Sequence, residues 1–125
     1  DEFEWYEKEM KTVLGINVYE YSFEREAGYT IIEKDGISLL LIKVEKLNSL
    51  EKVIADFIKE DKFKLCNYNL AIQKKYRYAY NDYLREVRIP TEYIDYYYMD
   101  NPYVDHFYTK DEKQWLYDKW SKSAR

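Results

Sequence analysis

The sequence of 125 residues contains one cysteine, one histidine, two prolines and three glycines. A single cysteine, Cys66, excludes an internal disulfide, so we expect a reducing compartment, the cytoplasm, and not a secreted disulfide scaffold. One histidine without a cysteine pair is too little for a usual zinc site, so no metal is expected. The glycines Gly15, Gly28 and Gly36 lie far apart, so these 125 residues hold no glycine-rich phosphate loop.

Long apolar runs are also missing, since the longest unbroken aliphatic run extends only from Leu39 to Ile42. A membrane-spanning helix needs about 20 apolar residues, so we expect no membrane span. The net charge of −4 argues against a nucleic-acid partner, because phosphate contacts need a concentrated positive field. The chain begins with Asp1, which suggests a fragment or a processed product.

Tyrosine, in contrast, is abundant, with 16 residues among the 19% that are aromatic. A tyrosine ring combines an apolar body with a polar tip, so it can pack a core, form an interface or stack on a sugar. The charged fraction of 35% and the chain length are typical of one soluble globular domain covering residues 1–125.

The stretch from Ile37 to Leu47 is the most apolar part of the chain and organises the predicted fold. Asp35-Gly36 before it is a strong hairpin turn signal, so we predict strands over 29–34 and 37–44. Four consecutive aliphatic residues, 39–42, are typical of a strand covered on both faces by helices. The sequence therefore predicts an α/β fold, with α+β as the alternative, in which about four to five helices pack a small sheet.

Apolar periodicity, capping residues and chain breakers place the other elements. Gly15 ends the first helix, Ser49 caps the next and Pro90 stops the third. We predict an extended connector over 16–28, a short strand over 63–66 in which Cys66 is buried, and helices over 3–14, 49–60, 72–87, 91–98 and 110–121.

One basic patch lies within residues 73–88, where five cationic side chains outnumber two acidic ones. It can bind the phosphate of a cofactor or an acidic glycan, with tyrosine rings beside it. The alternative is a solvated helix face. The candidate anion- or substrate-binding residues are Lys74, Lys75, Tyr76, Arg77 and Tyr80.

Two residues are candidates for catalysis. Glu45 follows the predicted buried strand, and sites in α/β proteins often form beyond the carboxyl ends of strands. His106 is adjacent to Asp105 and can act as a base. The structural alternatives are a carboxylate bound to the first turn of the following helix, and a histidine that anchors a loop. Tyr93 and the cluster Tyr96-Tyr-Tyr98 can stack on sugars or form a protein contact.

The order of Gly15-Ile-Asn-Val-Tyr19, Gly28-Tyr29 and His106-Phe-Tyr-Thr109 along the chain resembles the bacterial family of putative capsular polysaccharide synthesis proteins, and the middle of the chain looks sulfotransferase-like. The stretch from Leu41 to Leu47, followed by a helix to Ile58, is similar to a strand-to-helix segment of sulfotransferases. Three differences stand out: Asn17 replaces Asp, Lys43 stands where Arg is common, and Lys46 replaces the Asp after Glu45. The matching motifs are Phe3-Glu-Trp5-Tyr-Glu-Lys-Glu9, Gly15-Ile-Asn-Val-Tyr19, Phe23, Gly28-Tyr29, the set Asn69, Lys74, Tyr76 and Tyr80, and His106-Phe-Tyr-Thr109 with Glu112 and Trp120.

The resemblance implies the carboxy-terminal region of a larger protein that uses 3′-phosphoadenosine 5′-phosphosulfate and acts on a glycan acceptor. No glycine-rich loop for this cofactor is present, so we expect the 125 residues to be inactive alone. The alternative is a non-catalytic, tyrosine-rich module that binds a protein or a glycan. A truncated sheet exposes a strand edge, which would favour a homodimer.

Overall fold

The computed structural model describes residues 2–68 and 70–122, so Asn69 of the family resemblance lies outside them. The chain divides into two compact units. The first unit comprises the chain up to Lys64 together with Pro102–Thr109, and the second comprises Leu65–Asn101 and the chain from Lys110 onward. The described residues form an α+β fold of seven α-helices and one two-stranded antiparallel sheet.

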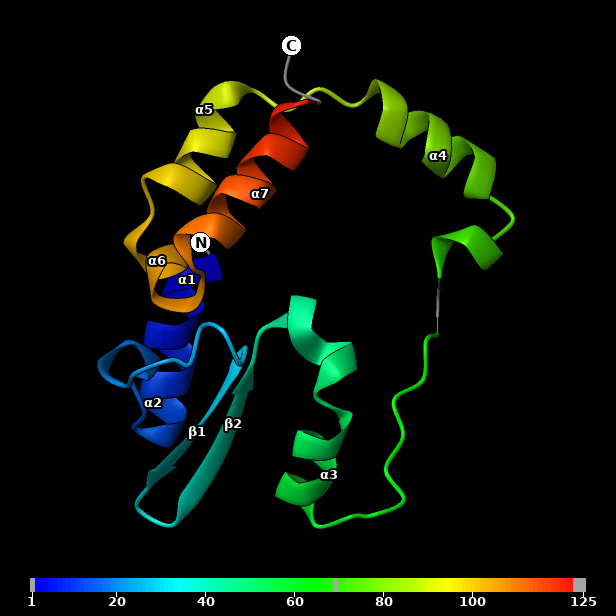
Figure 1. The fold of residues 1–125 in the computed structure, drawn as a ribbon. Helices are drawn as coiled ribbons and strands as arrows, with labels where there is room; N and C mark the ends of the chain where they lie inside the picture. Colours follow the sequence, from blue (N-terminus) through cyan, green and yellow to red (C-terminus); the bar gives the residue numbers. More distant parts are fainter. Residues whose placement is uncertain (1, 69, 123–125) are drawn as a thin grey trace. The chain divides into compact units, whose positions relative to one another are not determined.

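The predicted hairpin is present in the first unit (Figure 1). Strand β1 (Tyr29–Lys34) pairs with β2 (Ile37–Ile42), so that Ile32 lies opposite Leu39. Asp35 and Gly36 have φ values of 50° and 78°, the two positive angles that a type I′ turn requires. The turn chemistry therefore determined the register of the sheet.

A helix covers residues 2–14, close to the predicted range, and contains a π-helical turn. Its parts are α1 (Glu2–Trp5), η1 (Tyr6–Met10) and α2 (Lys11–Leu14). Gly15 ends it with φ 67°, and its N–H donates to the carbonyl of Lys11 at 3.0 Å.

The core of the first unit corrects one prediction. Ile16 and Val18 are 0% and 1% exposed, so the segment after Gly15 lies in the core and is not a connector at its edge. Asn17 stabilises the turn in this segment. Its side chain accepts a hydrogen bond from the backbone N–H of Tyr19 and so caps the 3-10 helix η2 (Val18–Glu20). Packed around these residues and Ile32 are Tyr6, Met10, Leu14, Ile37, Leu39 and Leu41.

Strand β2 is not buried on both faces, which corrects a second prediction. Alternate residues Ile37, Leu39 and Leu41 pack on the core, while Leu40 and Ile42 on the other face are half-buried. The run of aliphatic residues therefore indicates a strand with one core face and one partly covered face, in a sheet of two described strands.

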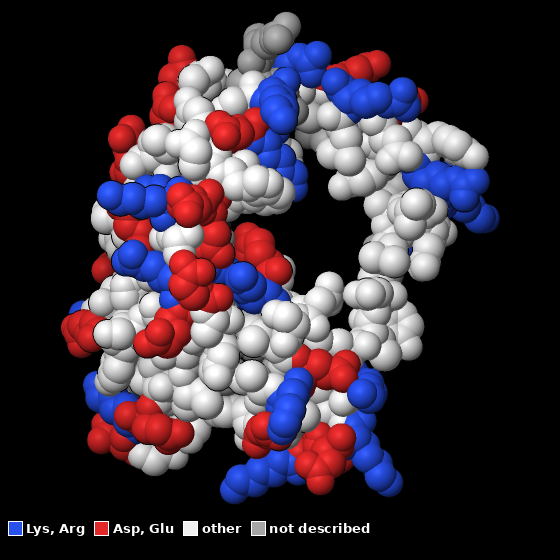
Figure 2. All heavy atoms as spheres, viewed as in Figure 1, with Lys and Arg blue, Asp and Glu red and all other residues white. Residues whose placement is uncertain are grey.

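The chain leaves β2 through a 3-10 helix, η3 (Val44–Ser49), before α3 (Glu51–Ile58). The predicted capping role of Ser49 is wrong, because its hydroxyl donates to the carbonyl of Lys46 at 2.7 Å and Leu50 occupies the N-cap position. Positive and negative side chains are interspersed around α3 (Figure 2), including the pair Lys52 and Asp56 at 2.8 Å.

The second unit is helical throughout its described elements. The predicted strand at 63–66 does not form, and Cys66 is exposed instead of buried. Residues 72–87, predicted as one helix, form a 3-10 turn and a shorter α-helix. The elements are η4 (Ala71–Gln73), α4 (Arg77–Glu86), α5 (Thr91–Ile94), the π-helix η5 (Asp95–Met99) and α7 (Lys110–Ser121).

Helix α7 packs on α5 and η5 around the buried Ile94 and Leu116. The predicted helix over 110–121 is confirmed by the bounds of α7. Helix α6 (Pro102–Phe107) belongs to the first unit, where Phe107 lies against Tyr6 with ring centroids 6.1 Å apart. Within the described ranges, no helix combines the length and apolarity needed to cross a membrane.

Gly28 and Gly36 form a matched pair for a stability test, because both have φ 78°. A Cβ at Gly36 meets nothing within 4 Å, whereas one at Gly28 would lie 2.3 Å from Cγ and 2.7 Å from Cβ of Lys46. We expect Gly36→Ala to lower the free energy of unfolding by about 1–2 kcal/mol through backbone strain alone. Gly28→Ala should cost about 1–3 kcal/mol more, because the start of the Lys46 side chain must move.

Urea unfolding of the two variants measures this difference. Equal losses of unfolding free energy in the two variants would contradict the close approach of Lys46 to Gly28.

Candidate functional site

A buried lysine follows strand β2. Lys43 is 4% exposed, and its Nζ donates to the backbone carbonyls of Arg25 at 2.8 Å and Phe107 at 3.3 Å. The same ammonium lies 4.9 Å from the centre of the Tyr108 ring, within the range of a cation–π contact. Lys43 therefore joins three segments of the first unit: the loop before β1, the end of β2 and the end of α6.

Tyr108 connects this lysine to the first catalytic candidate. Its hydroxyl lies 3.0 Å from both carboxylate oxygens of Glu45, to which it donates a shared hydrogen bond. Because a cation on the ring face draws electron density from the phenol, Lys43 makes the Tyr108 hydroxyl a better donor. Glu45 is exposed, so its carboxylate is oriented and still accessible from solvent.

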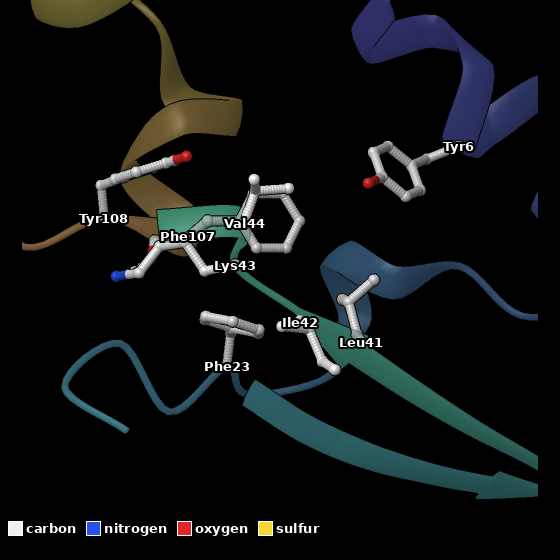
Figure 3. A pocket seen from close by; sticks show the side chains of 8 residues that line it. All are labelled: Tyr6, Phe23, Leu41, Ile42, Lys43, Val44, Phe107 and Tyr108. Atoms are coloured by element: carbon white, nitrogen blue, oxygen red, sulfur yellow. Dashed lines mark hydrogen bonds between the residues drawn. The ribbon is translucent and has the colours of Figure 1, made fainter. Parts of the chain in front are cut away.

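A pocket of about 160 Å³ lies beside these residues in the first unit. Figure 3 shows Lys43 and Tyr108 at one side of the pocket, Tyr6 at the other, and Phe23 and Phe107 between them. Small-molecule sites usually measure about 300–1,000 Å³, so this pocket can take one substituent of a ligand and not a whole nucleotide. Its lining residues are Tyr6, Phe23, Leu41, Ile42, Lys43, Val44, Phe107 and Tyr108.

His106, the second catalytic candidate, lies in α6 and does not line this pocket. Its ring packs against those of Tyr19 and Phe107, with centroids 5.5 and 4.9 Å away. Its Nε2 is buried and has no hydrogen-bond partner among the residues that the structure describes. Burial lowers the pKa of His106, with a further contribution from the charge of Arg25, so the neutral imidazole is favoured at pH 7.

The candidate anion-binding residues belong to the second unit. Lys74 is half-buried, while Lys75, Tyr76, Arg77 and Tyr80 are exposed. Arg77 donates to the hydroxyl of the neighbouring Tyr78 at 2.7 Å and stacks on its ring. The guanidinium has five N–H donors, so donors other than the one bound to Tyr78 can reach an anion, and the predicted role is compatible with this geometry.

The other two arginines of the patch already have partners nearby in the chain. Arg85 on α4 pairs with Asp82 at 2.7 Å, and Arg88, which follows α4, donates to the backbone carbonyls of Arg85 and Val87 at 3.0 and 2.9 Å. The usable cationic part of the patch is therefore its amino-terminal end. No group of three or more metal-ligating side chains occurs in the described part of the chain.

Sequence reasoning identified Glu45 but missed its partner Tyr108 and the role of Lys43. One sequence feature could have indicated the role of Lys43: it is a lone cation directly after an aliphatic run. A charged side chain at such a position is buried only if it finds polar partners. Its partners lie 18 and 64 residues away in the chain, so they could not be assigned without the fold.

Comparison with protein families matches residues 2–109 to a family described as putative capsular polysaccharide synthesis protein. The matched range includes Lys43, Glu45, His106, Tyr108 and the basic patch. Neither the comparison with curated proteins nor that with solved structures found a match.

Replacing Lys43 by methionine tests its structural role. We expect Lys43→Met to lower the free energy of unfolding by about 2–3 kcal/mol, because two backbone carbonyls lose a charged donor. Lys52→Met is the control, since Lys52 pairs with Asp56 at the surface and should cost about 0–1 kcal/mol. Urea unfolding measures both, and an equal effect would show that Lys43 does not hold the three segments together.

His106 is the only histidine, so its proton NMR titration is unambiguous. We expect a midpoint below 6.5 in the folded chain and near 6.5 in urea, because burial disfavours the charged ring. The contribution of His106 to the free energy of unfolding should be fully present above pH 6.5. It should be lost as the pH falls through the folded midpoint. A folded midpoint at or above the unfolded one would contradict the burial of the Nε2 atom of His106.

Proposed function

Because the chain belongs to the family of putative capsular polysaccharide synthesis proteins, we propose that it provides the acceptor side of a sulfotransferase-like reaction in that synthesis. In this proposal the chain is the carboxy-terminal part of a larger protein. It holds a glycan hydroxyl group and removes its proton, while the activated sulfuryl group is bound by another part of the full-length protein.

The orientation of Glu45 by Tyr108 is the observation that supports this assignment. A general base must be accessible to the acceptor and fixed within hydrogen-bond reach of its hydroxyl. Glu45 is exposed, and the Tyr108 hydroxyl holds its two oxygens at 3.0 Å. Lys43 in turn fixes the Tyr108 ring from its face. The carboxylate is thus placed by a chain of contacts that starts in the interior of the unit.

Glu45 is suited to accept the proton of a glycan hydroxyl as that oxygen becomes the nucleophile. The Tyr108 hydroxyl keeps its donor position on the carboxylate, which leaves the second lone pairs of the carboxylate oxygens for the acceptor. The adjacent pocket can hold one substituent of the sugar next to the reacting hydroxyl, since its walls are largely apolar and Lys43 lies at its side.

The cofactor implied by the resemblance, 3′-phosphoadenosine 5′-phosphosulfate, is too large for the pocket lined by Lys43 and Tyr108. That pocket is about 160 Å³, smaller than sites for whole nucleotides. We therefore assign this chain no step that involves the cofactor. Lys74, Lys75 and Arg77, with Tyr76 and Tyr80, are proposed to contact acidic groups of the glycan.

Sulfation of capsular polysaccharide by the full-length protein tests this function. We expect Glu45→Gln to lower the rate by about 100-fold or more, because the acceptor loses its base. Glu33→Gln is the matched control, since Glu33 is an exposed carboxylate on β1 that accepts a hydrogen bond from Ser38 at 2.6 Å. We also expect no sulfation by the 125 residues alone.

A Glu45→Gln protein that sulfates as fast as the parent protein would overturn the assignment of the base. A full-length protein without any sulfation activity would favour the non-catalytic, tyrosine-rich module.

A further inference from the structure

The second unit contains a separate, more aromatic pocket, which we call the aromatic cup. Its volume is about 280 Å³, larger than that of the pocket lined by Lys43 and Tyr108. Four of its six lining side chains are aromatic, and none is charged. The cup is lined by Ile89, Tyr93, Ile94, Tyr97, Tyr98 and Trp120.

Helical spacing explains how the cup forms. Tyr93 and Tyr97 are four residues apart, so they lie on the same side of the continuous α5–η5 helix. Ile94, only 2% exposed, anchors this helix, and α7 supplies Trp120 as the facing ring. The walls of the cup therefore come from two packed helices.

Contacts around the cup keep these walls in place. The interaction of the Tyr117 hydroxyl on α7 with the carboxylate of Asp95 on η5 raises the pKa of Tyr117. Tyr96 lies edge-on to Tyr97, with centroids 5.2 Å apart. Because these contacts join η5 to α7 and brace one wall, the cup exists before any ligand binds, which reduces the entropic cost of binding.

The chemistry of the lining favours a sugar ring. A pyranose has a flat face of C–H groups and a rim of hydroxyl groups, and tyrosine presents the complementary pair of an apolar ring and a polar tip. The aromatic rings that line the cup can stack on the C–H face of a sugar, and an anion would find no cation among the lining residues. Tyr93 is 60% exposed, so much of its ring remains available for stacking.

We propose that the aromatic cup binds a neutral pyranose unit of a glycan, as a subsite for the polysaccharide chain. The choice of a capsular glycan rests on the proposed function, but the cup itself and its affinity for a sugar do not. A volume of about 280 Å³ is at the lower limit of small-molecule sites, so the cup takes one sugar unit and binds an oligosaccharide in the millimolar range.

Titration of the 125-residue chain with cellotetraose and with chitotetraose tests the cup, using NMR saturation transfer and tryptophan fluorescence. Both probes are neutral chains of pyranose rings with exposed C–H faces. We expect saturable binding, and we expect Trp120→Ala to weaken it by about tenfold. Tyr93→Ala should weaken it as well, and because Tyr93 is exposed this variant keeps the fold.

Trp115→Ala is the matched control on the same helix. Lys119 lies 5.2 Å from the rings of both Trp115 and Trp120, but Trp115 is 60% exposed and does not line the cup. We expect its affinity for both probes to equal that of the parent chain. A loss as large as that of Trp120→Ala would overturn the assignment of the cup.

Two further outcomes separate this inference from the proposed function. Glu45→Gln should bind the probes as the parent chain does, because Glu45 does not line the cup. Binding together with a full-length protein that lacks sulfation activity would support the cup and refute the catalytic role. If neither probe binds saturably, the inference is wrong whether or not the full-length protein sulfates a glycan. The same holds if the chain binds only an apolar dye and Trp120→Ala abolishes that binding.

Discussion

The buried ammonium of Lys43 is the constraint on which the first unit depends. A charge with 4% exposure must be compensated by polar partners, and the fold provides carbonyls from two distant segments and the face of Tyr108. This requirement brings the loop before β1 and the end of α6 to the end of β2. The candidate site is therefore a consequence of burying one charge.

The same constraint connects structure to chemistry. The face of the Tyr108 ring contacts the buried Lys43, and its hydroxyl donates to Glu45. These two contacts fix the position of the Glu45 carboxylate. Neither Glu45 nor His106 lines the pocket, but the two differ in access: Glu45 is exposed, whereas His106 is half-buried among aromatic side chains with its Nε2 buried. Exposure and orientation are therefore the reasons why Glu45, and not His106, is the proposed acceptor base, whereas the sequence offered both residues as candidates.

The sequence predicts the hairpin turn and the end of the first helix, but it does not predict which distant segments pack together. Asp35-Gly36 determined the hairpin and Gly15 ended the first helix, because positive φ values leave few residue choices. The burial of Ile16 had no periodic signal in the sequence. Ser49 was expected to cap α3, but within a 3-10 helix its hydroxyl reaches the carbonyl of Lys46 instead. The strand containing Cys66 did not form because a short apolar run has no strand partner in the described chain.

Coupling between Glu45 and Tyr108 in the proposed sulfation reaction tests the central claim most directly. The rates of Tyr108→Phe, Glu45→Gln and the double variant of the full-length protein form a double-mutant cycle. If Tyr108 acts only by orienting Glu45, Tyr108→Phe slows the parent protein by about tenfold but adds no further loss to Glu45→Gln. Two independent losses that multiply in the double variant would contradict the account.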